Sequence, residues 1–211
     1  MVQMKPLILI GGGGHCKSVI EAAESVNREI KGILDLPDYL GSECLGYKVI
    51  GTDDDISKFV DDCEFIVTLG FIKNPTPRIR LHKLVEKHGG KFATIIASTA
   101  QVSKYANIGC GTVILHHATV NAGAIIGNFT IINTAANIEH DACIGNYSHI
   151  STGTMLNGDC KIGEACFIGS GTVVNNGIEI TNNCIVGSGS LVNSNILNAG
   201  TYIGSPIKRI K

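Results

Sequence analysis

Three ionisable side chains interrupt a long stretch of the chain that is otherwise almost free of charge. Glu139, His140 and Asp141 lie within NIEHDACIG, between two isoleucines. A neutral imidazole can take up a proton near physiological pH, and a carboxylate bonded to its other ring nitrogen fixes the tautomer and stabilises the protonated form. The three residues predict a general base, His140. Of the two carboxylates that could orient it, we expect Asp141 to do so.

Such a base could deprotonate an amine or a hydroxyl group as it attacks an acyl carbon, while a backbone N–H from the glycine-rich chain stabilises the oxyanion. Nothing in this chemistry separates an amine from an alcohol. Metal binding is not expected, because the histidines lack a compact ligand spacing with cysteine or carboxylate partners.

The segment that carries these residues has a six-residue repeat. From Val102 to Val192 every sixth residue is aliphatic, and the residue two places before each is small except at Ile178. A period of six excludes an α-helix and fits strands only if the chain turns a corner in every hexad. Three sides close one coil, so that residues 18 apart stack at the strand spacing of about 4.8 Å. The pattern predicts a hexapeptide β-helix.

Stacking by 18 residues shows where the repeat is interrupted. Glu139 is the one break in a ladder of asparagines, and His140 stacks between Ala122 and Gly158, whose small size leaves open space beside the imidazole. His149 is the one polar member of an apolar column and lies half a coil from His140, at a different corner. A site at a contact between subunits would use both histidines. The asparagines of the ladder are Asn121, Asn157, Asn175 and Asn193.

Residues 1–98 alternate short aliphatic runs with helix-like stretches, which predicts βαβ units on a parallel sheet. We therefore expect one domain over residues 1–98 and a second over 99–211. In LILIGGGGHCKSV the glycines lie between the first strand and the first helix, where backbone N–H groups can bind a phosphate. Cys16 replaces the third glycine of a dinucleotide motif, whereas Asp35 has the spacing of an acid that binds a ribose hydroxyl. NAD, a nucleotide sugar and a glycine turn that only packs remain open.

Composition excludes several classes of protein. The net charge is -1, with 44% hydrophobic and 17% charged residues, so neither a nucleic-acid partner nor disorder is expected. The run PLILI is too short for a membrane span or a signal peptide, which favours a cytoplasmic protein without membrane insertion. The eight cysteines are scattered without a CxxC pair and are expected to be reduced. Cys166 and Cys184, one coil apart, could form a bridge only under oxidising conditions.

The hexad run, the segment NTAANIEHDACIGNYSHIS and the closing GTYIGSPIKRI resemble the left-handed β-helix acyltransferases. The resemblance is strongest to the bacterial family of sialic-acid O-acetyltransferases and N-acetyltransferases of nucleotide-linked amino sugars, and LILIGGGGHCKSV resembles the start of that family's chains. It implies a Rossmann-like N-terminal domain followed by a left-handed β-helix. The handedness comes from the resemblance alone, since crossovers are usually right-handed. A homotrimer with acetyl-CoA between neighbouring β-helices is also implied.

The resemblance further implies roles for individual residues. His140 matches the catalytic base and Asp141 its orienting acid, where the family commonly has glutamate, while Glu139 also falls on a family motif. His149 is expected near the thioester, Asn133 near the substrate, and Gly158, Gly187 and Gly189 near pantetheine. Lys208 or Arg209 is expected at the CoA phosphate, and the nucleotide sugar is expected at Gly11, Gly13, His15, Lys17 and Asp35.

These observations predict an acetyl-CoA-dependent N-acetyltransferase that acts on a UDP-linked amino sugar. One alternative is O-acetylation of sialic acid or of another sugar hydroxyl. A second alternative is a trimeric scaffold that binds CoA or a nucleotide sugar without catalysis, and the cluster at residues 139–141 argues against it.

Overall fold

A computed structural model describes residues 4–210. Tertiary contacts divide the chain into two compact units. The first contains the chain up to Gly70 together with Thr76–Ser98, and the second contains Phe71–Pro75 together with the chain from Thr99 onward. The short segment Phe71–Pro75 thus packs with the second unit, although the first unit surrounds it in sequence.

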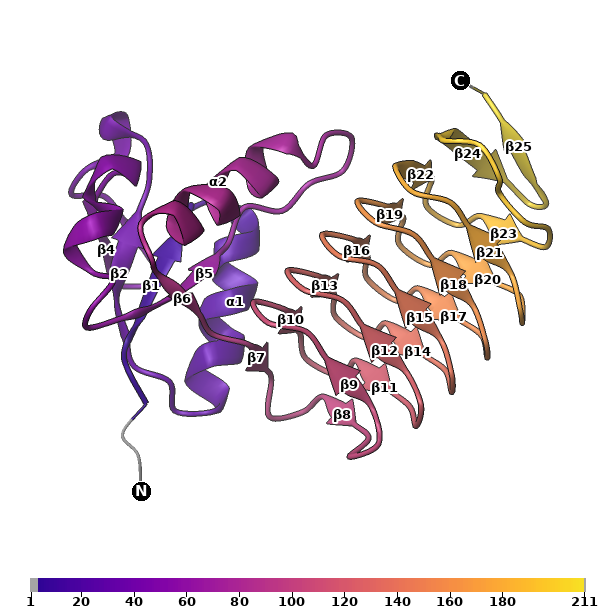
Figure 1. The fold of residues 1–211 in the computed structure, drawn as a ribbon, viewed down its shortest axis with the longest axis horizontal. Helices are drawn as coiled ribbons and strands as arrows, with labels where there is room; N and C mark the ends of the chain where they lie inside the picture. Colours follow the sequence, from indigo (N-terminus) through magenta and orange to yellow (C-terminus); the bar gives the residue numbers. More distant parts are fainter. Residues whose placement is uncertain (1–3, 211) are drawn as a thin grey trace. The chain divides into compact units, whose positions relative to one another are not determined.

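The first unit is built on a six-stranded sheet with the order β3-β4-β2-β1-β5-β6 (Figure 1). Every neighbouring pair is parallel except β3 with β4, which form an antiparallel hairpin inserted after β2. The βαβ pattern read from the sequence is therefore present, with this hairpin added. The strands are β1 (Leu7–Ile10), β2 (Ile30–Leu34), β3 (Glu43–Cys44), β4 (Tyr47–Gly51), β5 (Glu64–Val67) and β6 (Lys91–Phe92).

Helices connect these strands, and their apolar residues complete the core. The α-helices are α1 (Gly14–Ser25) and α2 (Thr76–Lys87), and the 3-10 helices are η1 (Pro37–Tyr39) and η2 (Asp53–Lys58). All four residues of β1 are buried, as expected for a central strand of a parallel sheet. Ile8 and Ile10 of this strand pack in one cluster with Phe65 and Val67 of β5 and Leu81 of α2. A last short strand of the unit is β7 (Ile95–Ile96).

The second unit is a β-helix whose short strands stack coil upon coil on three faces (Figure 1). The first face has β10 (Val113–Ile114), β13 (Ile131–Ile132), β16 (His149–Ile150), β19 (Phe167–Ile168), β22 (Cys184–Val186) and β24 (Gly200–Gly204), with β25 (Ile207–Arg209) antiparallel to β24. The second has β8 (Gln101–Val102), β11 (Thr119–Val120), β14 (Asn137–Ile138), β17 (Met155–Leu156), β20 (Val173–Val174) and β23 (Leu191–Val192). The third has β9 (Asn107–Ile108), β12 (Ile125–Ile126), β15 (Cys143–Ile144), β18 (Lys161–Ile162) and β21 (Glu179–Ile180).

The register of the β-helix is the one that the six-residue repeat predicts. Ile126 pairs with Ile144 and Ile144 with Ile162, so residues 18 apart are strand neighbours. The aliphatic residue of each of these strands points inward and is nearly inaccessible to solvent. Burial of this continuous aliphatic column is the main stabilising term, because each fully buried Ile or Val contributes about 1.5–3 kcal/mol.

The corners of the coils need an unusual backbone conformation. Every sixth residue from Gly111 to Gly189 has a positive φ, between 54° and 77°. Most amino acids avoid this left-handed region, and glycine, asparagine and aspartate tolerate it best. Two alanines, Ala135 and Ala165, also adopt it here, with φ of 55° and 54°. Asp141 lies at one of these corners, with φ of 62°.

Most of the small residues that precede the strands are buried, and several of their hydroxyl groups bond to the next coil. The hydroxyl of Ser148 donates to the carbonyl of Gly163 at 2.8 Å, and that of Thr112 donates to Gly127 in the same way. These bonds allow hydroxyl groups in an otherwise apolar interior, where an unpaired one would be costly.

Candidate active site

His140 and Asp141 form a hydrogen-bonded pair at a corner of the β-helix. The Nδ1 of His140 lies 2.9 Å from the Oδ2 of Asp141. A carboxylate only accepts hydrogen bonds, so Nδ1 carries the proton and Nε2 keeps a lone pair. The pair therefore has the arrangement of an oriented base, with Nε2 as the atom that can accept a proton.

Glu139 is held by two asparagines. Its Oε2 accepts a hydrogen bond from Asn121 at 3.1 Å, and its Oε1 accepts one from Asn137 at 2.9 Å. Asn121 is the preceding member of the asparagine ladder, so the glutamate continues the ladder as an acceptor. Glu139 acts on His140 through its charge alone.

The charges around His140 favour its protonated form. The hydrogen bond with Asp141 raises the pKa of the imidazole above its ordinary value, and the negative charges of Asp141, Glu139 and Asp159 add to this effect. Partial desolvation opposes them without cancelling them. The imidazole is thus a stronger base than a histidine in water.

The imidazole rests against Gly158 of the next coil. A Cβ atom built on Gly158 would lie 2.6 Å from both Cε1 and Nε2 of His140. The imidazole therefore occupies the space that the missing side chain of Gly158 leaves open. Even so, the side chains of His140 and Asp141 are 62% and 66% exposed within one chain. Within residues 4–210, most of the surface of both side chains is therefore open to water.

His149 lies inside the second unit and is 7% exposed. Its Nδ1 donates to the carbonyl oxygen of Phe71 at 2.9 Å, and its Nε2 accepts from the amide nitrogen of Asn133 at 3.0 Å. Its ring also makes edge contacts with Phe71 and Phe167. His149 and Asn133 are therefore brought together, and they anchor the segment Phe71–Pro75 to the β-helix.

The glycine loop of the first unit lies at the edge of two cavities. One has a volume of about 290 Å³ and the other about 220 Å³, and both are lined by Gly11, Asp35 and Leu69. Gly13 lines the larger one. The side chain of Asp35 bonds to the glycine loop, because its Oδ2 accepts a hydrogen bond from the N–H of Gly12 at 2.6 Å. Helix α1 begins here without a side-chain cap, and the N-terminal end of a helix favours an anion.

Two further residues expected to contact the nucleotide sugar follow the glycines in the first turns of α1. His15 and Lys17 are absent from the lining of both cavities. His15 lies against Gly70, at the end of the first unit's loop after β5, and Lys17 is exposed on α1.

The residues expected near the cofactor lie towards the last coils of the β-helix. Gly187 lines a largely apolar groove of about 490 Å³, together with Ile72, Lys73, Phe167 and Ile185. Gly189 is a corner residue with φ of 67°. On β25, Lys208 is exposed, and the guanidinium of Arg209 donates to the carbonyl of Ala199 at 3.2 Å.

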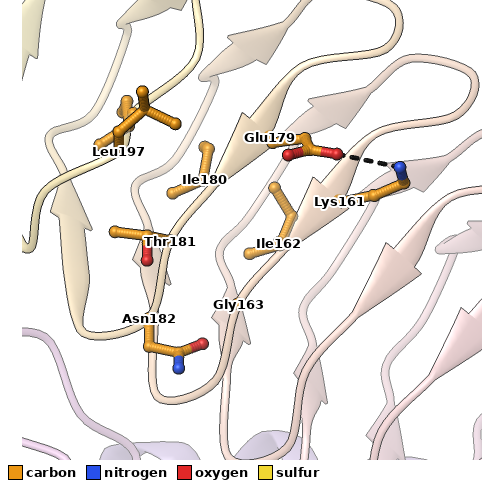
Figure 2. Close-up of a pocket in the computed structure, with 9 residues that line it drawn as sticks. Lys161, Ile162, Gly163, Glu179, Ile180, Thr181, Asn182 and Leu197 are labelled. Carbon is orange, nitrogen blue, oxygen red and sulfur yellow. Dashed lines mark hydrogen bonds and ion pairs between the residues drawn. The ribbon is translucent and has the colours of Figure 1, made fainter.

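A further depression of about 290 Å³ lies on the face that carries β18 and β21 (Figure 2). It is lined by apolar side chains such as Ile162 and Leu197, and the ion pair of Lys161 with Glu179 closes one edge at 2.9 Å. None of the site residues predicted from the sequence lines it.

Several other features bear on the expected chemistry. Among the described residues, no group of three or more histidine, cysteine or acidic side chains is placed to hold a metal ion. Within residues 4–210, no helix is both long and apolar enough to cross a membrane.

The cysteines are free thiols. Cys166 and Cys184 stack closely, and the interaction between their two thiols, together with burial, raises the pKa of the Cys166 thiol.

Comparison with known proteins identifies both units. Residues 6–84 match the family model of the PglD N-terminal domain, and residues 159–194 match that of the bacterial transferase hexapeptide repeats. No curated protein matches the chain by sequence. The solved acetyltransferase domain of PglB from Neisseria gonorrhoeae FA1090 is 30% identical, over 98% of this chain and 100% of that one, with a TM-score of 0.90. The chain belongs to the left-handed β-helix family of sugar acetyltransferases.

Related structures carry ligands. The PglB domain is also solved with acetyl coenzyme A. PerB from Caulobacter crescentus, solved with CoA and GDP-perosamine, is 29% identical over 99% of both chains, with a TM-score of 0.91. A histidine-to-asparagine variant of this perosamine N-acetyltransferase, with the same ligands, is 28% identical over 99% of this chain and 98% of that one, with a TM-score of 0.92. The expectations of a left-handed β-helix and of an acetyl-CoA-dependent acetyltransferase are confirmed, and a non-catalytic scaffold is not supported.

Three neighbours of the candidate site residues in this acetyltransferase were not singled out from the sequence. Asn137 donates a hydrogen bond to Glu139. This contact could have been predicted, because residues two apart in a strand face the same side. Gly123 stacks below Asp141 in the same corner column and could have been found there. The contact of the Phe71 carbonyl with His149 could not be predicted from the repeat, since the two residues are 78 apart in the sequence.

Proposed function

We propose that this acetyltransferase transfers the acetyl group of acetyl-CoA to the amine of an amino sugar carried on UDP, with His140 as the general base. The observation that carries the proposal is the 2.9 Å contact of His140 Nδ1 with Asp141 Oδ2, which leaves Nε2 as a proton acceptor. A related enzyme with a histidine replaced by asparagine, solved with CoA and a GDP-linked amino sugar, supports a histidine at the centre of the chemistry.

In the proposed reaction, the sugar amine attacks the thioester carbonyl as His140 Nε2 takes its proton. A C–N bond forms, the C–S bond breaks, and the sulfur leaves as thiolate, which the imidazolium can protonate. The Asp141 carboxylate stabilises the positive charge that the imidazole gains, and Glu139 and Asp159 add to its stabilisation. A general base of this kind contributes about 10²–10⁴-fold to the rate.

The exposure of the pair favours a site completed by another subunit. Acyl transfer is faster where water is excluded and fixed dipoles surround the reacting atoms, yet His140 and Asp141 are exposed by 62% and 66% in one chain. We therefore propose a homotrimer in which a neighbouring β-helix covers this corner and acetyl-CoA lies between them. Contacts with the cofactor are proposed for His149, Gly158, Gly187 and Gly189, and its phosphates are proposed to meet Lys208 or Arg209.

We assign the nucleotide part of the acceptor to the first unit, as a Rossmann-like domain. The cavities beside Gly11, Gly13 and Asp35 and the uncapped start of α1 together offer N–H donors and a carboxylate to a nucleoside diphosphate. His15, Lys17 and Asn133 are carried as further predicted contacts of the acceptor. A cytoplasmic location also remains a prediction from the sequence.

The test is CoA release from acetyl-CoA with a panel of acceptors. Release with a UDP-linked amino sugar, and loss of about 10²–10⁴-fold in kcat for His140→Ala, would support the proposal. His117→Ala is the control, since His117 is an exposed histidine at another corner of the same β-helix. Activity on sialic acid or another sugar hydroxyl, with none on any amino sugar, would establish O-acetylation instead. Normal turnover by His140→Ala would end the assignment of the base.

A further inference from the structure

The corner that holds Asp141 lies directly above Gly123 of the preceding coil. The two residues are 18 apart and share the left-handed conformation, with φ of 62° and 77°. The N–H of Asp141 donates to the carbonyl of Ala122 at 3.1 Å, which fixes this stacking. The surroundings of Gly123 bear directly on how the carboxylate of Asp141 is placed.

The carboxylate of Asp141 occupies the space that a side chain on Gly123 would fill. A Cβ built on Gly123 would overlap Oδ1 of Asp141 and lie 3.3 Å from its Cγ. The other carboxylate oxygen, Oδ2, is the one that contacts His140. The carboxylate is thus lodged between the bare Cα of Gly123 on one side and the imidazole on the other.

This arrangement is specific to one member of the corner column. The column continues from Asp141 to Asp159 and Gly177. Asp159 stacks on Asp141, which has a Cβ, so Asp159 does not have a glycine beneath it. Gly177 has no atom within 4 Å of the place where its Cβ would be. Only at Gly123 does the missing side chain make room for the acid that bonds to His140.

We infer that Gly123 is a positioning residue: its missing side chain lets the Asp141 carboxylate fold onto the preceding coil and reach Nδ1 of His140. The inference rests on the proposed role of His140 in catalysis. Its effect is on the geometry and basicity of the imidazole, so it can be measured without turnover.

The variant Gly123→Ala places a methyl group where the carboxylate lies. The coil can accept the backbone, because Ala135 and Ala165 already adopt the same conformation at other corners. The atom that must move is the end of the Asp141 side chain. Gly177→Ala is the matched control, since it has the same corner position and a φ of 67°, but open space around its Cβ. Gly123→Asn is a second variant, because asparagine tolerates this conformation and Asn183 shows it here.

The primary measurement is the NMR titration of the ring of His140 in the folded protein, with circular dichroism to check the fold. We expect the pKa of His140 to fall towards the ordinary value of about 6.5 in Gly123→Ala and in Gly123→Asn, and to keep the wild-type value in Gly177→Ala. With acetyl-CoA and an accepted sugar, kcat should fall about 10²-fold in both Gly123 variants, with KM little changed.

Two outcomes would overturn the inference. One is an unchanged pKa of His140 in folded Gly123→Ala, and the other is an equal fall in Gly177→Ala, which would assign the effect to backbone strain. Failure of the proposed function is distinguishable, because His140→Ala would then retain its turnover whatever the titration of the Gly123 variants shows.

Discussion

At the scale of single residues, the site depends on which carboxylate reaches His140. The structure gives that contact to Asp141, whereas Glu139 is bound by Asn121 and Asn137. Asp141 orients the imidazole through its bond to Nδ1, whereas Glu139 contributes only a nearby negative charge. Substitution of Asp141 should therefore change both the orientation and the pKa of His140, and substitution of Glu139 should change the pKa alone.

Asp141→Asn should change the pH dependence of the rate. The bond to Asp141 is the largest cause of the raised pKa of His140, so its loss lowers that pKa. The base must be neutral to act, and the rising acidic limb of kcat/KM should move to lower pH while its plateau falls. Asp159→Asn is the control, since Asp159 makes a smaller contribution to the same pKa and should cause a smaller shift. An acidic limb that stays in place in Asp141→Asn would contradict this account.

Gly158→Ala should displace the imidazole itself. The added Cβ would lie 2.6 Å from Cε1 and Nε2, so the ring must swing away from its position. A misplacement of about 1 Å can cost about 10²-fold in rate, and we expect a loss of that order in kcat. Ala122→Gly, on the other side of the same column, removes a methyl group instead and should have little effect on kcat. Equal activities of the two variants would show that the ring does not depend on Gly158.

At the scale of the element, β12, β18 and β21 of the third face of the β-helix each have one buried and one exposed side chain. In β18, Ile162 is 4% exposed and faces the interior, while Lys161 pairs with Glu179 on the outside (Figure 2). Ile162→Ala should lower the free energy of unfolding by about 2–5 kcal/mol, measured by urea denaturation. Lys161→Ala should lower it by less than about 1 kcal/mol, because an exposed ion pair contributes little. Similar losses for both would contradict an interior column as the source of stability.

The segment Phe71–Pro75 is an element whose place depends on His149. Replacing this histidine by leucine removes the bonds to the Phe71 carbonyl and to Asn133, and leaves buried polar atoms without their partner. Each such atom costs about 1–3 kcal/mol. We expect faster hydrogen exchange in residues 71–74 of His149→Leu, measured by mass spectrometry, and no change in His117→Leu. Unchanged exchange in His149→Leu would mean that other contacts hold the segment.

At the scale of the whole molecule, the proposed assembly has a measurable mass. If three chains cover one another's exposed catalytic corners, sedimentation equilibrium should give three times the chain mass of 22.2 kDa. Acetyl-CoA should stabilise this assembly, because a ligand that binds only the assembled state shifts the equilibrium towards it. A monomer with full activity would remove the reason for placing the site between subunits.

Much of the β-helix could be predicted from the sequence alone. The six-residue period specifies which residues face inward and which residues stack, and Ile126, Ile144 and Ile162 pair as that period requires. A repeat can be read in this way because each coil has the same geometry as the last, so that position in the repeat determines position in space. The left-handed coiling was the exception, since it came from the resemblance.

The contacts of the candidate site were decided only by the tertiary structure. Adjacency in sequence allowed either Glu139 or Asp141 to serve His140, and the direction of each side chain settled the choice. The bond of His149 to the carbonyl of Phe71 joins residues 78 apart and leaves no trace in the repeat. By itself, the sequence determined the coil, its interior and the cluster of three charges. Side-chain direction and long-range contacts depend on the packed chain, and so only the structure decided which atoms of that cluster meet.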